Sequence, residues 1–304
     1  MPAENYQIID ERFGKLVHGN AHLDKLWTGG RWAEGPAYFP AGKYLIWSDI
    51  PNDRLMRYDE TNGEVSVFMQ PCNNHNGHTT DAQGRLVSCE HKGRCVSRIE
   101  HDGSYTVLAS HYDGKRLNSP NDLVTKSDGS VWFTDPSYGI DSEYEGDASP
   151  SEIGARNVYR IDPDDGAVTK IVTDMVQPNG LAFSPDESLL YVADTGTTHD
   201  PSCEAKIRTY PVSADGKSVG EGNLFALCGN GLFDGFRVDT HGRIWSSAAD
   251  GVHCFDVDGT LLGKIHVPEV VANVCFGGPK RNRLYICGTT SLYAIYVNAE
   301  GCVR

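Results

Sequence analysis

Residues 178–194 read PNGLAFSPDESLLYVAD, and the chain repeats this kind of unit along its length. The segment has a polar head at Asn179, a short apolar run, a turn at Pro185-Asp186 and a second apolar run that closes on Asp194. Short runs rich in apolar residues between turn signals are typical of β-strands. The unit therefore predicts two successive strands of an antiparallel sheet.

Six such units follow one another at the spacing that marks propellers and solenoids. In most of them a third and a fourth strand follow the first two. The heads are Glu34, Asn76, Asn121, Asn179, Asp234 and Asn273, at intervals of 42, 45, 58, 55 and 39 residues. We therefore predict an all-β fold, a six-bladed β-propeller with four antiparallel strands per blade. Two β-sandwich domains are the alternative, but no linker rich in Pro, Gly or Ser divides the chain.

The ring needs a strand from the N-terminal side, because the chain after Asn273 has room for only about three strands. Residues 23–27 (LDKLW) are apolar enough to supply the fourth strand and to remove two open sheet edges. We expect an N-terminal extension over residues 1–20 and one propeller domain over residues 21–304. Polar insertions at residues 141–156 and 195–205 lengthen two repeats, and we expect them to form loops on one face.

Composition excludes several classes of partner. The 304 residues carry 41 acidic and 27 basic side chains, a net charge of −14, which repels nucleic acid and anionic membranes. No apolar run is long enough to span a membrane, and the N-terminus lacks the features of a secretory signal. The nine cysteines include no C-x-x-C pair, so we expect reduced, structural thiols. These features predict a cytoplasmic protein with a small-molecule partner; they do not indicate an oligomeric state.

Four of the heads carry oxygen donors that a propeller would bring together at one end of its central channel. Glu34, Asn121, Asn179 and Asp234 offer two carboxylates and two amide carbonyls, a donor set suited to Ca²⁺ and also to Mg²⁺. Any one of these residues could simply form a turn. Burying Glu34 beside Asp234 without a cation would be costly, so the combination predicts one divalent cation.

Five motifs in order resemble one protein family. They are RWAEGP at 31–36, LNSPND at 117–122, WFTDPSYG at 132–139, PNGLAFSPD at 178–186 and DGF at 234–236. Together they resemble the gluconolactonase and regucalcin (senescence marker protein) family, and within it the bacterial gluconolactonase branch. The likeness extends from about Leu23 to the C-terminal strands.

The resemblance implies a six-bladed propeller with one catalytic divalent cation, usually Ca²⁺, with Mg²⁺, Mn²⁺ or Zn²⁺ as alternatives. Glu34, Asn179 and Asp234 match metal ligands of the family. Asn121 matches a position that binds the metal in some members and the substrate in others. Regucalcin-like members carry an Arg two residues before that Asn, whereas this chain has Ser119.

The activity implied by the resemblance is hydrolysis of a sugar lactone to the aldonic acid. The cation would polarise the lactone carbonyl, and Asp234 would accept a proton from the attacking water. Alternatively, the metal acidifies its own water and Asp234 only positions that water. A phosphotriesterase-type hydrolase and a non-catalytic interaction platform are the other functions that the pattern allows.

Further residues are candidates for contact with the substrate at the mouth of the channel. They are two histidines, two acids on which second strands close, and a tyrosine: His78, His91, Glu90, Asp135 and Tyr138. Trp32 and Phe236, with Tyr138, are candidates for the pocket wall.

Overall fold

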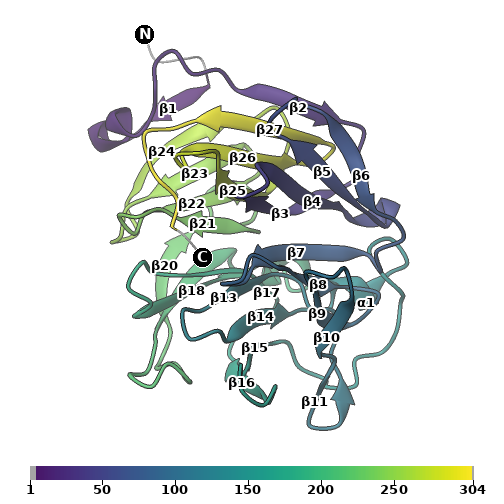
Figure 1. Cartoon of the computed structure of the whole chain (residues 1–304). Helices are drawn as coiled ribbons and strands as arrows, with labels where there is room; N and C mark the ends of the chain where they lie inside the picture. Colours follow the sequence, from purple (N-terminus) through teal and green to yellow (C-terminus); the bar gives the residue numbers. More distant parts are fainter. Residues whose placement is uncertain (1–4, 303–304) are drawn as a thin grey trace.

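The computed structural model describes residues 5–302 and has six antiparallel sheets arranged as the blades of a propeller (Figure 1). Blade one contains β3 (Ala33–Phe39), β4 (Tyr44–Asp49), β5 (Arg54–Asp59) and β6 (Val65–Met69). Blade two contains β7 (His75–Thr80), β8 (Leu86–Glu90), β9 (Cys95–Ile99) and β10 (Tyr105–Ala109). Blade three contains β13 (Leu123–Thr125), β14 (Val131–Asp135), β15 (Asn157–Ile161) and β16 (Val168–Val172).

The remaining blades follow the same order from the inner strand outward. Blade four contains β17 (Pro178–Phe183), β18 (Leu189–Asp194), β19 (Lys206–Pro211) and β20 (Asn223–Leu227). Blade five contains β21 (Phe236–Val238), β22 (Ile244–Ala248), β23 (Gly251–Phe255) and β24 (Leu261–His266). Blade six contains β25 (Val271–Gly277), β26 (Arg283–Gly288), β27 (Ser291–Tyr296) and, from the N-terminal side, β2 (Asp24–Thr28).

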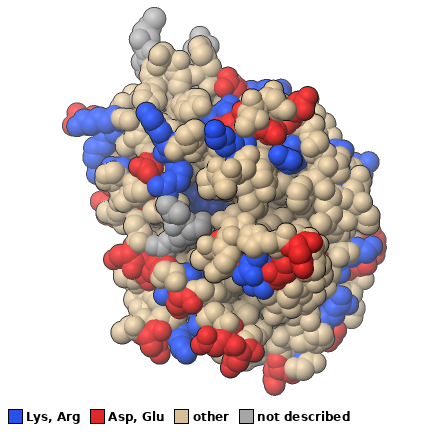
Figure 2. All heavy atoms as spheres, in the orientation of Figure 1, with Lys and Arg blue, Asp and Glu red and all other residues tan. Residues whose placement is uncertain are grey.

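Short elements complete the chain. They are the hairpin β11 (His111–Tyr112) and β12 (Lys115–Arg116), the helix α1 (Tyr138–Asp141), and the 3-10 turns η1 (Glu11–Lys15), η2 (Ile50–Asn52) and η3 (Gly196–Thr198). No helix within residues 5–302 is long and apolar enough to cross a bilayer. All nine cysteines are free thiols. On the face shown in Figure 2, acidic and basic side chains are interspersed without a broad basic patch.

The N-terminal strand closes the ring as predicted. β2 pairs antiparallel with β27, with Asp24 opposite Ala294, so blade six contains strands from both ends of the chain. Trp27 from this strand packs edge-on against Trp47 of blade one, with ring centroids 5.6 Å apart. The closing strand therefore also ties the last blade to the first.

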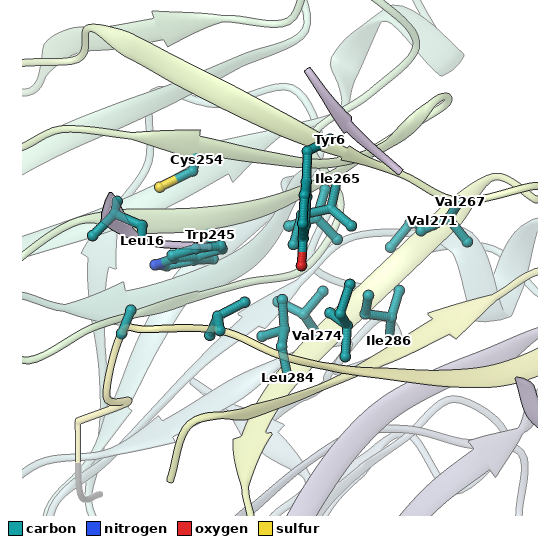
Figure 3. Packing of buried hydrophobic residues seen from close by; sticks show 14 of the residues in the cluster. Tyr6, Leu16, Trp245, Cys254, Ile265, Val267, Val271, Val274, Leu284 and Ile286 are labelled. Atoms are coloured by element: carbon teal, nitrogen blue, oxygen red, sulfur yellow. The ribbon is translucent and has the colours of Figure 1, made fainter. Parts of the chain in front are cut away.

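Residues 6–16, which we assigned to an N-terminal extension, pack onto blades five and six. β1 (Tyr6–Ile8) pairs with the outer strand β24 and gives blade five a fifth strand, which covers an otherwise open edge. Phe13 is fully buried, and its ring centroid lies 6.1 Å from that of Trp245. Tyr6 and Leu16 join the same apolar cluster (Figure 3). The boundary at residue 20 stays a prediction.

The inner strands form a closed ring in which each contacts the next: β3, β7, β13, β17, β21 and β25. Four of these strands have a β-bulge at or beside the predicted head, as between Glu34 and Ala37 in β3 and between Pro178 and Leu181 in β17. A bulge changes the direction of a side chain relative to the regular alternation. Asn76 and Asn179 lie inside such an irregularity and have no partner in the register of their blade, whereas Glu34 is a paired residue at the edge of one.

Glycines that follow the heads bring neighbouring inner strands close together. A Cβ on Gly180 would lie 2.2 Å from the carbonyl oxygen of Asp234, the head of the next blade, and the Gly180 N–H donates to that oxygen at 3.0 Å. Gly35 approaches Asn76, the head of the second blade, equally closely: a Cβ there would lie 2.0 Å from the Asn76 carbonyl oxygen. These glycines are needed for contact between blades, which explains the Asn-Gly and Glu-Gly pairs better than a turn does.

We predict that Gly180→Ala destabilises the protein by about 2–3 kcal/mol, because the added methyl group meets backbone atoms that cannot move independently. Gly229→Ala is the matched control, since a Cβ there would have no heavy atom within 4 Å. Urea unfolding of both variants measures the difference. Equal midpoints for the two variants would contradict this account of the glycine contacts.

Candidate functional site

Four predicted oxygen donors line one pocket at an end of the central channel. Glu34 and Asn179 are the second residues of β3 and β17, while Asn121 and Asp234 lie two residues before β13 and β21. The pocket has a volume of about 220 Å³ and is lined by Trp32, Glu34, Asn76, Asn121, Tyr138, Glu145, Asn179, Thr195, Thr198, Leu232 and Asp234. Four different blades thus contribute the four donors.

The two carboxylates of this set lie in an environment that opposes their ionisation. Glu34 is 3% exposed; burial, and next the charge of Asp234, raise its pKa well above the usual value. Burial also raises the pKa of Asp234, and the charges of Glu145 and Asp122 add to this effect. In the described part of the chain, no lysine or arginine lines the pocket to balance these acids. A cation between them would remove the cost of burying both charges.

The chemistry of the donor set fits an oxygen-ligated divalent cation. Within residues 5–302, no three His, Cys, Asp or Glu side chains come together as a metal site. A metal site here would therefore depend on the amide oxygens of Asn121 and Asn179 as well as on two carboxylates. Carboxylate and amide oxygens are ligands for Ca²⁺ and Mg²⁺, whereas zinc sites generally use histidine and cysteine.

The two polar insertions meet at the mouth of this pocket. His199 Nε2 lies 2.9 Å from Asp141 Oδ2, which joins residues 195–205 to the start of residues 141–156. The hydroxyl of Tyr138 hydrogen-bonds to Thr195 Oγ1 at 2.6 Å and to Thr198 Oγ1 at 2.9 Å. Tyr138 therefore lines the pocket as part of a wall that the insertions build; its contact with substrate stays a prediction.

The acids that close the second strands support the loops that lead to the heads. Each accepts backbone N–H groups two or three residues before its head: Asp49 from Arg31 at 2.8 Å, Asp135 from Asn118 and Ser119 at 2.9 Å each, and Asp194 from Gln177 at 2.9 Å. Charged acceptors of backbone N–H groups are strong hydrogen-bond partners. These acids therefore fix the path of the chain immediately before Glu34, Asn121 and Asn179.

The structure does not bring Asp135, Glu90, His78 or His91 into the pocket lining. Glu90 is buried against His75 Nε2 at 3.0 Å and the Tyr105 hydroxyl at 2.6 Å. His78 is buried between hydroxyls of blades one and two, Ser48 and Ser88, each at 2.8 Å. His78 instead lines a second cavity of about 110 Å³, together with Arg237. That cavity lies further along the inner strands.

His91 lies behind the pocket wall. Its Nδ1 donates to the carbonyl oxygen of Glu145 at 3.1 Å, and its Nε2 lies 3.1 Å from Asn76 Nδ2. Burial lowers the pKa of His91 to about 4, so the ring is neutral at physiological pH. Of the other predicted wall residues, Trp32 lines the pocket, whereas Phe236 is buried in the core between blades four and five.

Sequence reasoning missed five lining residues: Glu145, Thr195, Thr198, Leu232 and Asn76, the last of which was identified only as a repeat head. Three of them belong to the insertions, and Leu232 precedes the head of blade five. The only sequence signal for the first three was that both insertions lengthen their repeats. The repeat pattern itself does not say which insertion side chain turns inward.

The comparisons with known proteins agree with this architecture. A family model described as "SMP-30/Gluconolactonase/LRE-like region" matches residues 32–290. The gluconolactonase of Zymomonas mobilis is 29% identical, over 95% of this chain and 85% of that protein. The pentonolactonase XacC of Haloferax volcanii is 32% identical, over 85% of this chain and 82% of that protein.

A solved gluconolactonase structure from Xanthomonas campestris superposes with a TM-score of 0.90 and 37% identity, covering 98% of this chain and 96% of that one. The resemblance inferred from the five motifs is thereby confirmed. The chain belongs to the SMP-30/gluconolactonase/LRE-like family.

Proposed function

We propose that this protein is a lactonase that opens the ester ring of a sugar lactone of the gluconolactone type. The observation that carries the proposal is the meeting of Glu34, Asn121, Asn179 and Asp234 in a pocket that no basic side chain of residues 5–302 lines. The names of the relatives, gluconolactonase and pentonolactonase, support the same class of substrate. We further propose that these four side chains hold one divalent cation, with Ca²⁺ as the first choice.

A bound cation would supply Lewis-acid polarisation of the ester carbonyl. The chain's own residues have other tasks. Asp234 is the group that faces the attacking water, either as the acceptor of its proton or as the hydrogen-bond partner that orients it. In the overall reaction the water oxygen bonds to the carbonyl carbon and the ring C–O bond breaks. The released ring oxygen ends as a hydroxyl, and the acid product loses its proton to solvent.

The pocket wall is suited to a polyhydroxylated ring. Trp32 and Leu232 present apolar surface, while Asn76, Thr195 and Thr198 offer hydrogen-bonding groups. Small-molecule sites commonly combine apolar walls with a few polar groups that fix orientation. We propose that these polar side chains contact the lactone hydroxyls.

We predict that Asp234→Asn and Glu34→Gln each lower kcat/KM for gluconolactone by at least about 100-fold, because each removes one charge from the proposed ligand set. Neither variant should unfold, since each replaces a buried carboxylate with a neutral group of the same shape. Steady-state kinetics and thermal unfolding test both statements. Glu221→Gln, at an exposed position, is the matched control. Full activity in both pocket variants would place the site elsewhere.

We predict that removal of divalent cations abolishes turnover and lowers the unfolding temperature, and that Ca²⁺ restores both. A ligand present at 100 times its Kd stabilises a protein by about 2.7 kcal/mol. Asp234→Asn should lose this response to Ca²⁺, which calorimetry measures without any substrate. A metal-free sample, checked by elemental analysis, that still hydrolyses lactone would contradict the cation proposal.

A substrate panel separates the lactonase from its alternatives. It should include gluconolactone, a pentonolactone and an activated phosphotriester, each with Ca²⁺, Mg²⁺, Mn²⁺ and Zn²⁺. We expect the lactones to be hydrolysed faster than the phosphotriester. Hydrolysis of the phosphotriester alone would favour the phosphotriesterase, and turnover of no compound would favour an interaction platform.

A further inference from the structure

Glu145 is a third acid of the pocket, and it comes from an insertion instead of a blade. It lines the cavity with Glu34 and Asp234, and its side chain is 24% exposed. Burial is the main cause of the raised pKa of Asp234, and repulsion from the Glu145 carboxylate adds to it. The repeated heads do not include this residue.

Contacts at Glu145 and at the two residues after it hold this part of the insertion in place. The Glu145 carbonyl accepts a hydrogen bond from His91 Nδ1 at 3.1 Å. The next residue, Gly146, packs so closely on α1 that a Cβ would lie 2.1 Å from the Gly139 carbonyl oxygen. Lys92 pairs with Asp147 at 3.1 Å on the outer side. The segment around Glu145 is thus anchored to blades two and three.

Among the charged groups described around the pocket, the Glu145 carboxylate is the one whose negative charge is not balanced. A divalent cation between Glu34 and Asp234 would be neutralised by those two carboxylates. The nearby Asp122 faces its own partner, Arg237, at 3.5 Å. His91, whose Nδ1 lies 3.9 Å from Glu145 Oε2, is neutral because burial lowers its pKa. With a cation bound, the pocket would therefore carry one net negative charge, contributed by Glu145.

We propose that Glu145 sets the charge specificity of the pocket: it admits neutral polyhydroxylated lactones and excludes lactones that carry a phosphate or sulfonate group. The carboxylate can accept hydrogen bonds from sugar hydroxyls, whereas it repels an anionic substituent. Among the residues that the structure describes, no lysine or arginine lines the pocket to offset this repulsion. The inference rests on the proposed lactonase activity.

The test compares two lactones that share a ring and differ in charge, glucono-1,5-lactone and its 6-phosphate. Burial, and then Asp141, raise the pKa of Glu145 to about 7, so assays at pH 8 keep the carboxylate ionised. We predict that Glu145→Gln raises the ratio of kcat/KM for the phosphorylated over the neutral lactone about tenfold. Glu145→Asp should keep the wild-type ratio, because it keeps the charge.

Two controls separate charge from shape. Glu143→Gln makes the same chemical change in the same insertion at an exposed position, and it should leave the ratio unaltered. Added salt should raise the ratio in the wild type and have less effect in Glu145→Gln, since screening weakens electrostatic repulsion. An equal change of ratio in Glu145→Asp and Glu145→Gln, or no change in Glu145→Gln, would overturn the proposal.

Calorimetry with Ca²⁺ alone provides a readout without turnover. Glu145→Gln should bind Ca²⁺ within about threefold of the wild-type Kd, because Glu145 is assigned to the substrate and not to the cation. A weakening of more than about tenfold would make Glu145 a metal ligand and overturn the proposal. If the wild type hydrolyses neither lactone, the proposed function itself fails; if it hydrolyses them and the ratio does not respond, only this inference fails.

Discussion

The close contact between neighbouring inner strands is the constraint on which the rest of the structure depends. At Gly180 the backbone of blade four approaches the Asp234 carbonyl so closely that no side chain fits between them. The same contact links Gly35 to Asn76 in the first two blades. Because each glycine directly follows a head, the packing that closes the ring also sets the distance between heads. The geometry of the pocket is therefore a consequence of how the blades meet.

This arrangement buries the mutually repelling carboxylates of Glu34 and Asp234 together in one pocket. Glu34 accepts a hydrogen bond from Asn273 Nδ2 at 2.9 Å, which offsets only part of the free-energy cost of burying its charge. Asp234 faces further acids, and no basic side chain between residues 5 and 302 lines the pocket beside it. Strongly perturbed carboxylates concentrated in one cleft are typical of functional sites. The described core elsewhere pairs its acids, as with Glu90 and His75 or Asp49 and Arg54.

The fold and the oxygen donors could be predicted from the sequence because both are periodic. Repeats that build equivalent blades place equivalent residues at equivalent positions, so matching Glu34 with Asp234 amounts to matching their places in the ring. The closing strand at residues 24–28 followed from the same count of strands. The role of Asp135 could not be predicted, because a conspicuous acid at a fixed offset fits substrate contact and support of a loop equally well. Only its hydrogen bonds to the N–H groups of Asn118 and Ser119 decide between them.

The insertions are not part of the sequence repeat, and for this reason Glu145 and Thr198 could not be predicted as lining residues. The blades leave little freedom at the heads, since the glycine contacts, the bulges and the second-strand acids all act on the same few residues. The insertions are not constrained in this way. They are held by contacts with each other, such as Asp141 with His199, and by contacts with the blades, such as Asp147 with Lys92. Loops held on a rigid scaffold are where binding properties can vary without loss of the fold. In the function proposed above, the blades of this propeller would define where a cation and an ester carbonyl meet, and the insertions would define which lactone reaches that point.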